Sequence, residues 1–413
     1  MAEEEGFEPS EVLPSTVFET ATIDHSATPP ATQGIAQTRV CCQAHFCGQT
    51  GNAATSVPIK TAAGFTLAGQ GGYRTCMRIR SFLVASLCLS MAACSILQGP
   101  TNGQGQTFSS FYAQLRRQAQ AKGYNPADLD AAFKGKPAPL FSVTKAEGNQ
   151  PELVRTFEDY VGAMLSSTRI AQGRQNMELH ADQLKAAAAK TGVSPSVIVA
   201  LWGVETNFGK SQGTQPVIPA LVTLAWQSPR SSYFRTEVFK ALKVADQTGT
   251  PTAQLKGSWA GAMGQCQFMP SSYLAYAVDG DNDGKVDIWN NTADVFASTA
   301  NFLRAKGDWQ SGQAWRLPAG HINLGGLKLN NRGLSSAYPL SDWEARGFIL
   351  PKDIRGYTEG SKLRYYRPEQ GGPAYLLGSN FDAILKWNNS SYFAFSVLSL
   401  ADILAQEEGQ GGS

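Results

Sequence analysis

An acidic side chain at the end of a long apolar segment is the first candidate for chemistry. The segment VSPSVIVALWGVETNFGKSQG covers residues 193–213, and its Ser-Pro pair is typical of a helix N-terminus. Helical spacing places Glu205 on the same face as three apolar residues, Ile198, Leu201 and Trp202. Burial and the negative end of the helix both disfavour a carboxylate, so we expect a raised pKa for Glu205, as a general acid needs near neutral pH. The alternative is a boundary glutamate paired with Lys210 or an arginine.

A second candidate is the aspartate-rich segment DGDNDGKVDIWN, residues 279–290. Its spacing is that of an EF-hand calcium loop, with Gly284 where the chain must turn sharply. The predicted metal ligands are Asp279, Asp281, Asp283, Lys285 through its carbonyl, Asp287 and Asn290. Asn290 stands where a bidentate glutamate is usual, which predicts weaker calcium affinity. We expect calcium to stabilise the loop without taking part in the reaction; the alternative is an aspartate-rich turn without metal.

A third segment, GSWAGAMGQCQFMPSS at 257–272, is rich in small residues. Gly257, Gly261 and Gly264 let the backbone come close to a ligand or to a neighbouring helix. The spacing alone leaves both interpretations open.

Together these segments resemble the lytic murein transglycosylase B family of bacterial cell-wall enzymes. The resemblance continues through TADVFASTANFLRAKGDW at 292–309 and LKWNNSSYFAFSV at 385–397, and it covers about 108–405. It implies a mainly α (α+β) fold, a lysozyme-like helical catalytic domain with a small β-containing insertion and an EF-hand-like calcium loop. It also implies that Glu205, in the VET motif, is the single catalytic acid/base.

The implied reaction is cleavage of the β-1,4 bond between N-acetylmuramic acid and N-acetylglucosamine in peptidoglycan. The muramyl product closes on itself as a 1,6-anhydro sugar, and the catalysis needs no cofactor. A water-using muramidase on the same scaffold is one alternative. A non-catalytic peptidoglycan-binding or scaffolding lipoprotein is the other.

The resemblance also implies a set of substrate-binding residues. These are Ser258, Gln267, Phe268, Met269, Arg230, Tyr233, Trp387, Asn388 and Tyr392. Trp387 stands where the family has a tyrosine, a replacement expected to remove a hydroxyl hydrogen-bond donor. Cys266 occupies a position that is usually small or aromatic, and we expect a buried, inert thiol.

The elements that must position these residues are mostly helical. Apolar spacing, caps and helix-ending residues predict helices at 108–123, 125–133, 151–173, 178–191, 292–309 and 392–405, besides the one carrying Glu205. We expect a helical catalytic domain at 108–306, a small region of short strands and loops at 307–380, a C-terminal segment at 381–405 packing on the catalytic domain, and a tail at 406–413. His180 is predicted on a helix surface and His321 in a loop, and neither is expected to be catalytic.

The sequence pattern of the N-terminal part predicts a targeting region. Residues 77–93 combine Arg78 and Arg80 with the uncharged stretch Ser81–Ala93, which predicts a signal peptide. Small residues before Cys94 resemble a lipoprotein box, so Cys94 is the predicted lipidation site and 94–107 a tether; an ordinary cleaved signal is the alternative. Residues 1–76 are then a misassigned extension or a disordered leader.

Composition narrows the classes of function that remain possible. The chain has 413 residues, a net charge of +2 and only 16% charged residues, so a basic nucleic-acid-binding surface is not expected. Six of the seven cysteines precede residue 95, which leaves Cys266 without an intramolecular partner downstream. The family resemblance and the lipoprotein-like box together imply a monomer in the periplasm, held to the outer membrane by a lipid anchor, with peptidoglycan glycan strands as its partner.

Overall fold

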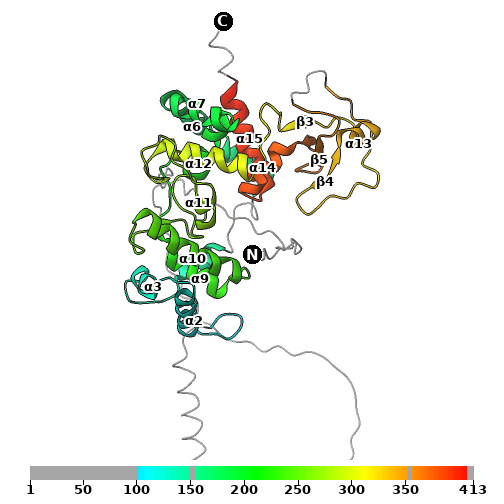
Figure 1. Cartoon of the computed structure of the whole chain (residues 1–413). Coiled ribbons are helices and arrows are strands. Elements are labelled where there is room, and N and C mark those ends of the chain that lie inside the picture. Colours follow the sequence, from blue (N-terminus) through cyan, green and yellow to red (C-terminus); the bar gives the residue numbers. More distant parts are fainter. Residues whose placement is uncertain (1–100, 148–154, 352–355, 407–413) are drawn as a thin grey trace, which may run out of the picture. The chain divides into compact units, whose positions relative to one another are not determined.

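The computed structural model describes residues 101–147, 155–351 and 356–406 (Figure 1). Helices dominate these residues as predicted, and the strands are short and few. The predicted signal peptide, Cys94 and most of the tail lie outside the described residues.

Several helices begin at short polar caps. Thr107, Asn125, Ser166, Asn291 and Ser390 each accept a backbone N–H in the first turn of the helix that follows. The first group of helices is α2 (Phe108–Ala121), α3 (Pro126–Ala132), α4 (Phe141–Glu147), α5 (Phe157–Met164), α6 (Ser167–Leu179) and α7 (Ala181–Thr191). The second is α8 (Pro195–Thr206), α9 (Val217–Gln227), α10 (Ser231–Thr248), α11 (Pro270–Tyr276), α12 (Thr292–Ala305), α13 (Leu340–Ala345), α14 (Ser379–Trp387) and α15 (Ser391–Ala405).

Two helices lie in the core and are buried on every side. In α8 each residue from Ser196 to Thr206 is buried, and in α9 each residue from Val217 to Trp226. Helices α6, α7, α12 and α15 pack around α8, while α10 packs along α9. The sequence predicted a single apolar face for the helix of Glu205; that was too narrow, because a helix surrounded by others has no solvent face.

Two predicted helices are each interrupted by a break in the structure. The described part of 151–173 forms α5 and then α6, with Ser166 as the cap of the second helix. The predicted helix 178–191 breaks at His180, which ends α6 and begins the chain into α7. The His180 ring packs edge-on against Trp202 and Phe296, so its predicted place on a helix surface is wrong. His321 is exposed in a loop, as predicted.

The strands form two small antiparallel sheets. Strands β1 (Gln215–Pro216) and β2 (Lys256–Gly257) pair next to the small-residue segment. The larger sheet has the order β3-β6-β5-β4, from Arg316–Pro318, Tyr375–Leu377, Lys362–Tyr366 and Leu334–Pro339. Figure 1 shows these strands gathered with α13, within the region predicted to be rich in strands and loops.

The larger sheet packs against one hydrophobic cluster on each face. Leu363 and Tyr365 of β5 belong to a small hydrophobic cluster around Trp343 of α13. Tyr366, the next residue, turns to the opposite face and joins the helical core beside Phe381 and Phe395. Because successive side chains of a strand point to opposite faces of the sheet, this one sheet contacts both hydrophobic clusters.

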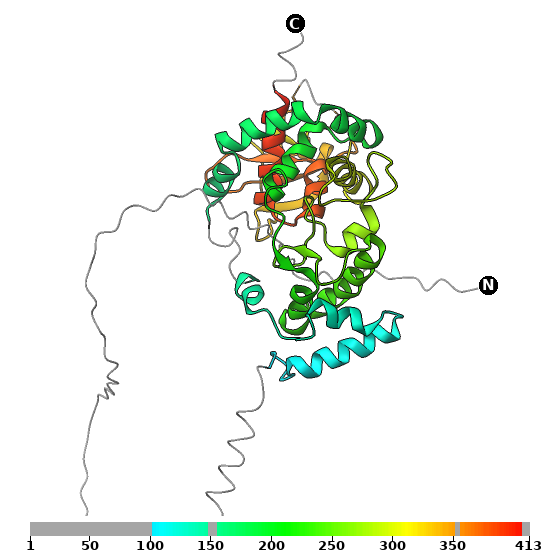
Figure 2. The same cartoon turned by 90° about the vertical axis from the view of Figure 1, so that its left-hand side faces the viewer.

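The N-terminal helices cover α9. Helices α2 and α3 contact α9, and Figure 2 shows them against the α9–α10 part of the unit. Among the described residues no single helix has the length and apolar character of a membrane span; only the sharply bent pair α7 and α8 meets those criteria jointly.

Candidate active site

Glu205 lies at the C-terminal end of α8 and is 4% exposed. The indole N–H of Trp387, the last residue of α14, donates a hydrogen bond of 2.7 Å to Glu205 Oε1. Two elements far apart in the sequence thus meet at one carboxylate. Burial disfavours the charged form of Glu205, and the Trp387 hydrogen bond favours it.

The chain turns sharply directly after Glu205. Helix α8 ends at Asn207, which adopts a left-handed conformation, and Phe208 and Gly209 also have positive φ angles. The helix thus ends before Gly209, and Gly209 serves a packing role. A Cβ at Gly209 would lie 2.2 Å from Gln265 Oε1, so only glycine fits there without displacing Gln265.

Gln265 joins this turn to the small-residue segment. Its Oε1 accepts from Trp202 Nε1 at 2.8 Å, and its Nε2 donates to the Trp289 carbonyl at 2.9 Å. Its own carbonyl accepts from Thr206 Oγ1 at 3.0 Å. These bonds hold the end of α8 against residues 257–272.

A pocket opens at Glu205 between α8, the small-residue segment, α12 and the end of α14. Seven residues that the sequence analysis singled out line it: Glu205, Ser258, Gln267, Phe268, Met269, Trp387 and Asn388. The remaining lining residues are Ala260, Ala262, Ser272 and Phe302. Sequence reasoning did not name these four, although each lies in a segment that carried the resemblance.

The polar groups in the pocket are held by backbone contacts. Ser258 Oγ accepts from the Ala262 N–H at 3.1 Å. Gln267 has a φ of 52°, and its Nε2 donates to the carbonyls of Gly264 and Gln212 at 2.9 and 3.1 Å. Both side chains are therefore set in place before any ligand arrives.

An aromatic cluster forms one wall of the pocket. The Trp387 ring lies 5.3 Å from the Phe268 ring and 4.9 Å from the Phe302 ring, between centroids. Such packing fixes the indole plane and hence the direction of its N–H. The expected loss of a hydrogen-bond donor at this position is corrected: tryptophan supplies a ring N–H in place of the hydroxyl.

Three predicted substrate-binding residues lie outside the lining of this pocket. Arg230 stacks over the Phe234 and Tyr233 rings at the start of α10. Tyr392 packs edge-on against Phe157 of α5. Their predicted contact with substrate stays a prediction.

Cys266 is buried behind the pocket. It is 2% exposed, and its Sγ lies 3.7 Å from the Val295 carbonyl. Burial raises the pKa of the Cys266 thiol to about 12, so the thiol is neutral near neutral pH. This agrees with the expected inert thiol.

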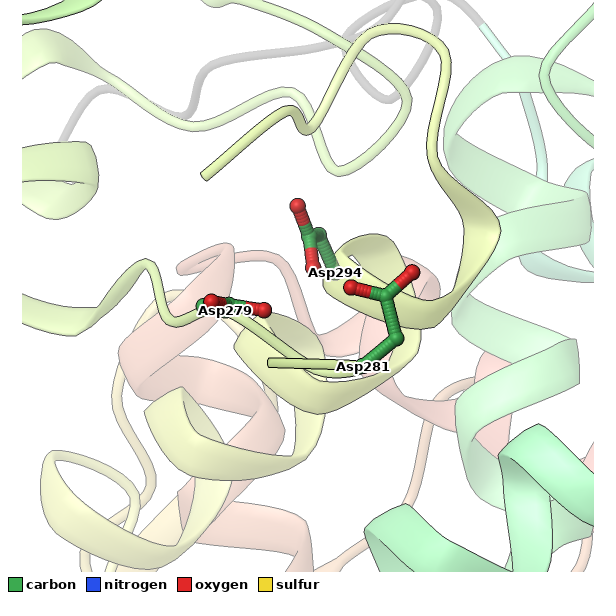
Figure 3. A group of neighbouring side chains, drawn as sticks. All are labelled: Asp279, Asp281 and Asp294. Atoms are coloured by element: carbon green, nitrogen blue, oxygen red, sulfur yellow. The ribbon is translucent and has the colours of Figure 1, made fainter. Parts of the chain in front are cut away.

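Two carboxylates of the aspartate-rich segment lie next to a third from α12 (Figure 3). Oxygen atoms of Asp279, Asp281 and Asp294 lie within 4.8 Å of one another, and Figure 3 shows one oxygen of each turned toward a common space. Asp294, on α12, was not among the predicted ligands. It is fully buried and accepts from the backbone N–H groups of Gly280 at 2.7 Å and Asp287 at 2.6 Å.

Three other predicted ligands, Asp283, Asp287 and Asn290, have their side chains engaged within the loop. Asp287 Oδ1 accepts from the Trp289 N–H, and Asp287 Oδ2 accepts from Asn290 Nδ2 at 3.0 Å. Asp283 Oδ1 accepts from the Lys285 N–H at 2.8 Å. Their predicted contribution to a metal site stays a prediction.

The residues that line the pocket in the described part of the chain include one carboxylate, Glu205. Glycosidases commonly place two carboxyl groups at the scissile bond, one as acid and the other as nucleophile or base. With a single carboxyl group, the same side chain must release a proton and later take one up. The second proton donor must then come from the ligand itself or from water.

Comparisons with a family model and with a known protein both give transglycosylases. The family model described as “Transglycosylase SLT domain” matches residues 107–402. Membrane-bound lytic murein transglycosylase B of Escherichia coli K12 is 33% identical over 271 residues, covering 65% of this chain and 72% of that protein.

Solved structures give the same likeness. SltB3 of Pseudomonas aeruginosa, in complex with NAG-anhNAM-pentapeptide, is 37% identical with a TM-score of 0.64, covering 73% of this chain and 80% of that chain. The E. coli lytic transglycosylase Slt35 in complex with calcium is 28% identical with a TM-score of 0.63, covering 76% of this chain and 98% of that chain.

Proposed function

The chain belongs to the SLT-domain family of lytic transglycosylases, enzymes that act on peptidoglycan, and we propose that Glu205 is its single catalytic acid/base. The observation that carries this assignment is a buried carboxyl group, hydrogen-bonded to Trp387, in a pocket lined by the segments that identify the family. These comparisons confirm the predicted membership of the chain in this family and the predicted lysozyme-like fold.

In the first step, protonated Glu205 donates its proton to the glycosidic oxygen between N-acetylmuramic acid and N-acetylglucosamine. The bond from muramyl C1 to that oxygen breaks, and N-acetylglucosamine leaves with a free hydroxyl. Positive charge develops at C1, and the carboxylate now formed stabilises it. The muramyl N-acetyl group assists, as in substrate-assisted glycosidases.

In the second step, the Glu205 carboxylate takes the proton of the muramyl C6 hydroxyl. The C6 oxygen closes onto C1 and forms the 1,6-anhydro ring. Glu205 is again protonated, so protons balance over the cycle and no water is consumed. One carboxyl group suffices because the acid of the first step is the base of the second.

The pocket supplies the contacts that orient the sugar. Ser258, Gln267 and Asn388 offer polar groups, while Phe268, Met269 and Trp387 offer apolar faces of the kind that pack on sugar rings. We assign Arg230, Tyr233 and Tyr392 to outer contacts with the glycan or its peptide.

Mass spectrometry of digested murein tests the reaction. The expected products of the wild-type protein are muropeptides with 1,6-anhydro ends. Reducing ends would identify a water-using muramidase, and intact murein would identify a non-catalytic binding protein.

Two isosteric substitutions test the proposed acid/base role of Glu205. Glu205→Gln should fold normally and lose turnover, since an amide cannot donate the required proton. Glu237→Gln is the matched control: Glu237 is also a buried helical glutamate, 1% exposed, but it accepts from the Ser271 N–H outside the pocket lining. Near-normal turnover in Glu205→Gln, or equal losses in both variants, would refute the assignment.

The aspartate-rich loop is proposed to hold structural calcium. Asp279, Asp281 and Asp294 supply grouped carboxylate oxygens, the ligands calcium prefers. Three close anions also repel one another, which a cation relieves. When bound, calcium would neutralise this charge and stabilise the joint between the loop and α12. Asp294 then takes the place that spacing assigned to Asn290.

A calcium titration followed by thermal unfolding tests this proposal. We expect the Tm of the wild-type protein to rise with calcium, and the rise to shrink in Asp294→Asn. Asp308→Asn is the control, because Asp308 follows α12 outside this group of carboxylates, and it should respond as the wild type does. An unchanged Tm in the wild type would contradict a calcium site.

The cellular placement is proposed from the N-terminal motifs. A signal peptide at 77–93 and lipidation at Cys94 would deliver a monomeric enzyme to the periplasmic face of the outer membrane, next to its glycan strands. The E. coli relative named membrane-bound lytic murein transglycosylase B supports this placement.

A further inference from the structure

Gln212 lies in the short segment between the turn after α8 and strand β1. Its side-chain Nε2 donates to the Gly209 carbonyl at 3.3 Å and to the Trp289 carbonyl at 3.0 Å. Its own backbone carbonyl accepts from Nε2 of the pocket residue Gln267 at 3.1 Å. A residue outside the pocket lining thus receives the side chain of a residue inside it.

The contacts of Gln267 decide which end of its amide group a ligand can use. The two N–H groups of Nε2 donate to the carbonyls of Gly264 and Gln212, at 2.9 and 3.1 Å. A backbone carbonyl cannot donate, so a reversed amide would place oxygen against oxygen at both contacts. The hydrogen-bonding group that Gln267 retains for a ligand is therefore the acceptor Oε1.

We propose that Gln212 is a positioning residue, which fixes the Gln267 amide so that Oε1 accepts a hydrogen bond from a donor group of the bound glycan. This inference rests on the proposed function of the pocket and adds to it a residue that does not line the pocket. Gln212 acts through Gln267, because its own side chain bonds to Gly209 and Trp289.

The physical reason lies in the backbone that carries the Gln212 carbonyl. Gly209 and Gly213 flank this segment, and both have positive φ angles. Glycine gives the backbone more conformational freedom than any other residue, so the segment needs additional contacts to stay in one arrangement. The Gln212 side chain supplies them by bonding to Gly209 within the segment and to Trp289 of the aspartate-rich loop.

Trp289 is a fixed anchor for this contact. Its carbonyl also accepts from Gln265 Nε2, and its N–H donates to Asp287 Oδ1, both at 2.9 Å. Gln265 in turn holds the end of α8 through Thr206. These bonds do not involve Gln212, so the helix that carries Glu205 stays anchored without its side chain. We therefore expect Gln212 to affect ligand affinity more than the chemical step.

Binding of a muropeptide with a 1,6-anhydro end, the product of the proposed reaction, tests this role without turnover. Gln212→Met keeps an unbranched side chain of the same length and removes both N–H donors. The Kd from isothermal titration calorimetry should rise about three- to tenfold, as expected when one neutral hydrogen bond is lost. KM for soluble glycan strands should rise as well, while kcat should change little.

Gln313→Met is the matched control. Gln313 is also a partly buried glutamine whose Nε2 donates to a backbone carbonyl, that of Gly356 at 3.0 Å, but it lies outside the pocket lining. This variant should keep the Kd and the KM of the wild type. Equal increases in both methionine variants would mean a general structural effect and would overturn the proposal.

A double-mutant cycle shows whether Gln212 acts through Gln267. Gln267→Ala removes the acceptor and should itself raise the Kd. In that background Gln212→Met should have no further effect on the Kd, because the group that it positions is already gone. Fully additive effects would overturn the positioning role. Thermal unfolding of each variant checks that it is folded at the temperature of the titration.

The outcomes separate this inference from the proposed function. A wild type that makes anhydro products and binds them no more tightly than Gln212→Met does would overturn this inference alone. A Glu205→Gln variant that keeps its activity would instead overturn the proposed function.

Discussion

Two buried glutamates show how surroundings set the role of one residue type. Glu205 ends a helix inside a pocket and accepts from a side-chain N–H. Glu237, in α10, accepts from the Ser271 backbone N–H at 2.8 Å and does not line that pocket. Both are almost fully buried, so burial alone does not distinguish a reactive acid from a structural one.

The pH dependence of stability should reveal the raised pKa of Glu237. Burial raises the pKa of Glu237 by more than the Ser271 hydrogen bonds and Lys240 lower it. The folded protein thus holds this proton to higher pH than the unfolded chain, and the free energy of unfolding falls as pH rises through that interval. Glu237→Gln escapes this loss, so its stability relative to the wild type should be greater at about pH 7 than at about pH 4.

Urea unfolding of both proteins at the two pH values measures the difference. Comparing them at each pH cancels the titration of the other carboxyl groups. The same stability difference at both pH values would contradict the assigned shift.

At the scale of elements, the turn after α8 joins the helix that carries Glu205 to residues 257–272. Asn207, Phe208 and Gly209 all have positive φ, which carries the chain back toward residues 257–272. Left-handed backbone costs about 1–2 kcal/mol for a residue with a Cβ. Hydrogen bonds from Trp202 and Thr206 to Gln265 compensate for that cost.

Gly209→Ala should disturb this turn more than backbone strain alone predicts. The new Cβ would displace Gln265 from Trp202, so we expect a loss of stability above about 1–2 kcal/mol together with reduced turnover. Gly249→Ala is the control, because Gly249 also has a left-handed φ, 65°, and nothing lies within 4 Å of its added Cβ.

Urea unfolding and turnover of the two variants separate strain from displacement. Gly249→Ala should show the strain and keep full turnover. Equal effects of both substitutions would show that contact with Gln265 has no special role.

At the scale of the whole unit, one sheet connects two hydrophobic clusters. Leu363 and Tyr365 pack in the cluster around Trp343, while Tyr366 and Leu377 pack in the helical core. Neighbouring residues of the same strands therefore stabilise both parts. We expect the strand region and the helices to unfold together rather than as separate domains.

Trp343→Ala tests this coupling. Trp343 is fully buried and donates to the Leu363 carbonyl at 3.1 Å, so its truncation should cost about 3–5 kcal/mol. The control is Ile349→Ala, since Ile349 is 87% exposed and its loss should change little.

Far-ultraviolet circular dichroism follows the helices, and hydrogen exchange of the β5 amides follows the sheet. Both transitions should shift to the same lower midpoint in Trp343→Ala. A helical transition that stays in place while the sheet is lost would show independent units.

Local features were predictable from the sequence. Caps, prolines and apolar spacing identified most helices, and the spacing around Glu205 placed it at the end of one of them. Residues 257–272 and 385–397 were singled out with most of the pocket lining. These features depend on neighbours a few residues away, which a linear pattern records.

Contacts between distant segments were decided by the tertiary structure. Glu205 and Trp387 are 182 positions apart, so no spacing rule could show that an indole N–H replaces the expected hydroxyl. Asp294 lies beyond the loop that spacing defined and joins Asp279 and Asp281 because α12 folds back on that loop. The full burial of α8 and the break at His180 likewise follow from packing against other helices, which is a property of the folded chain and not of any single segment.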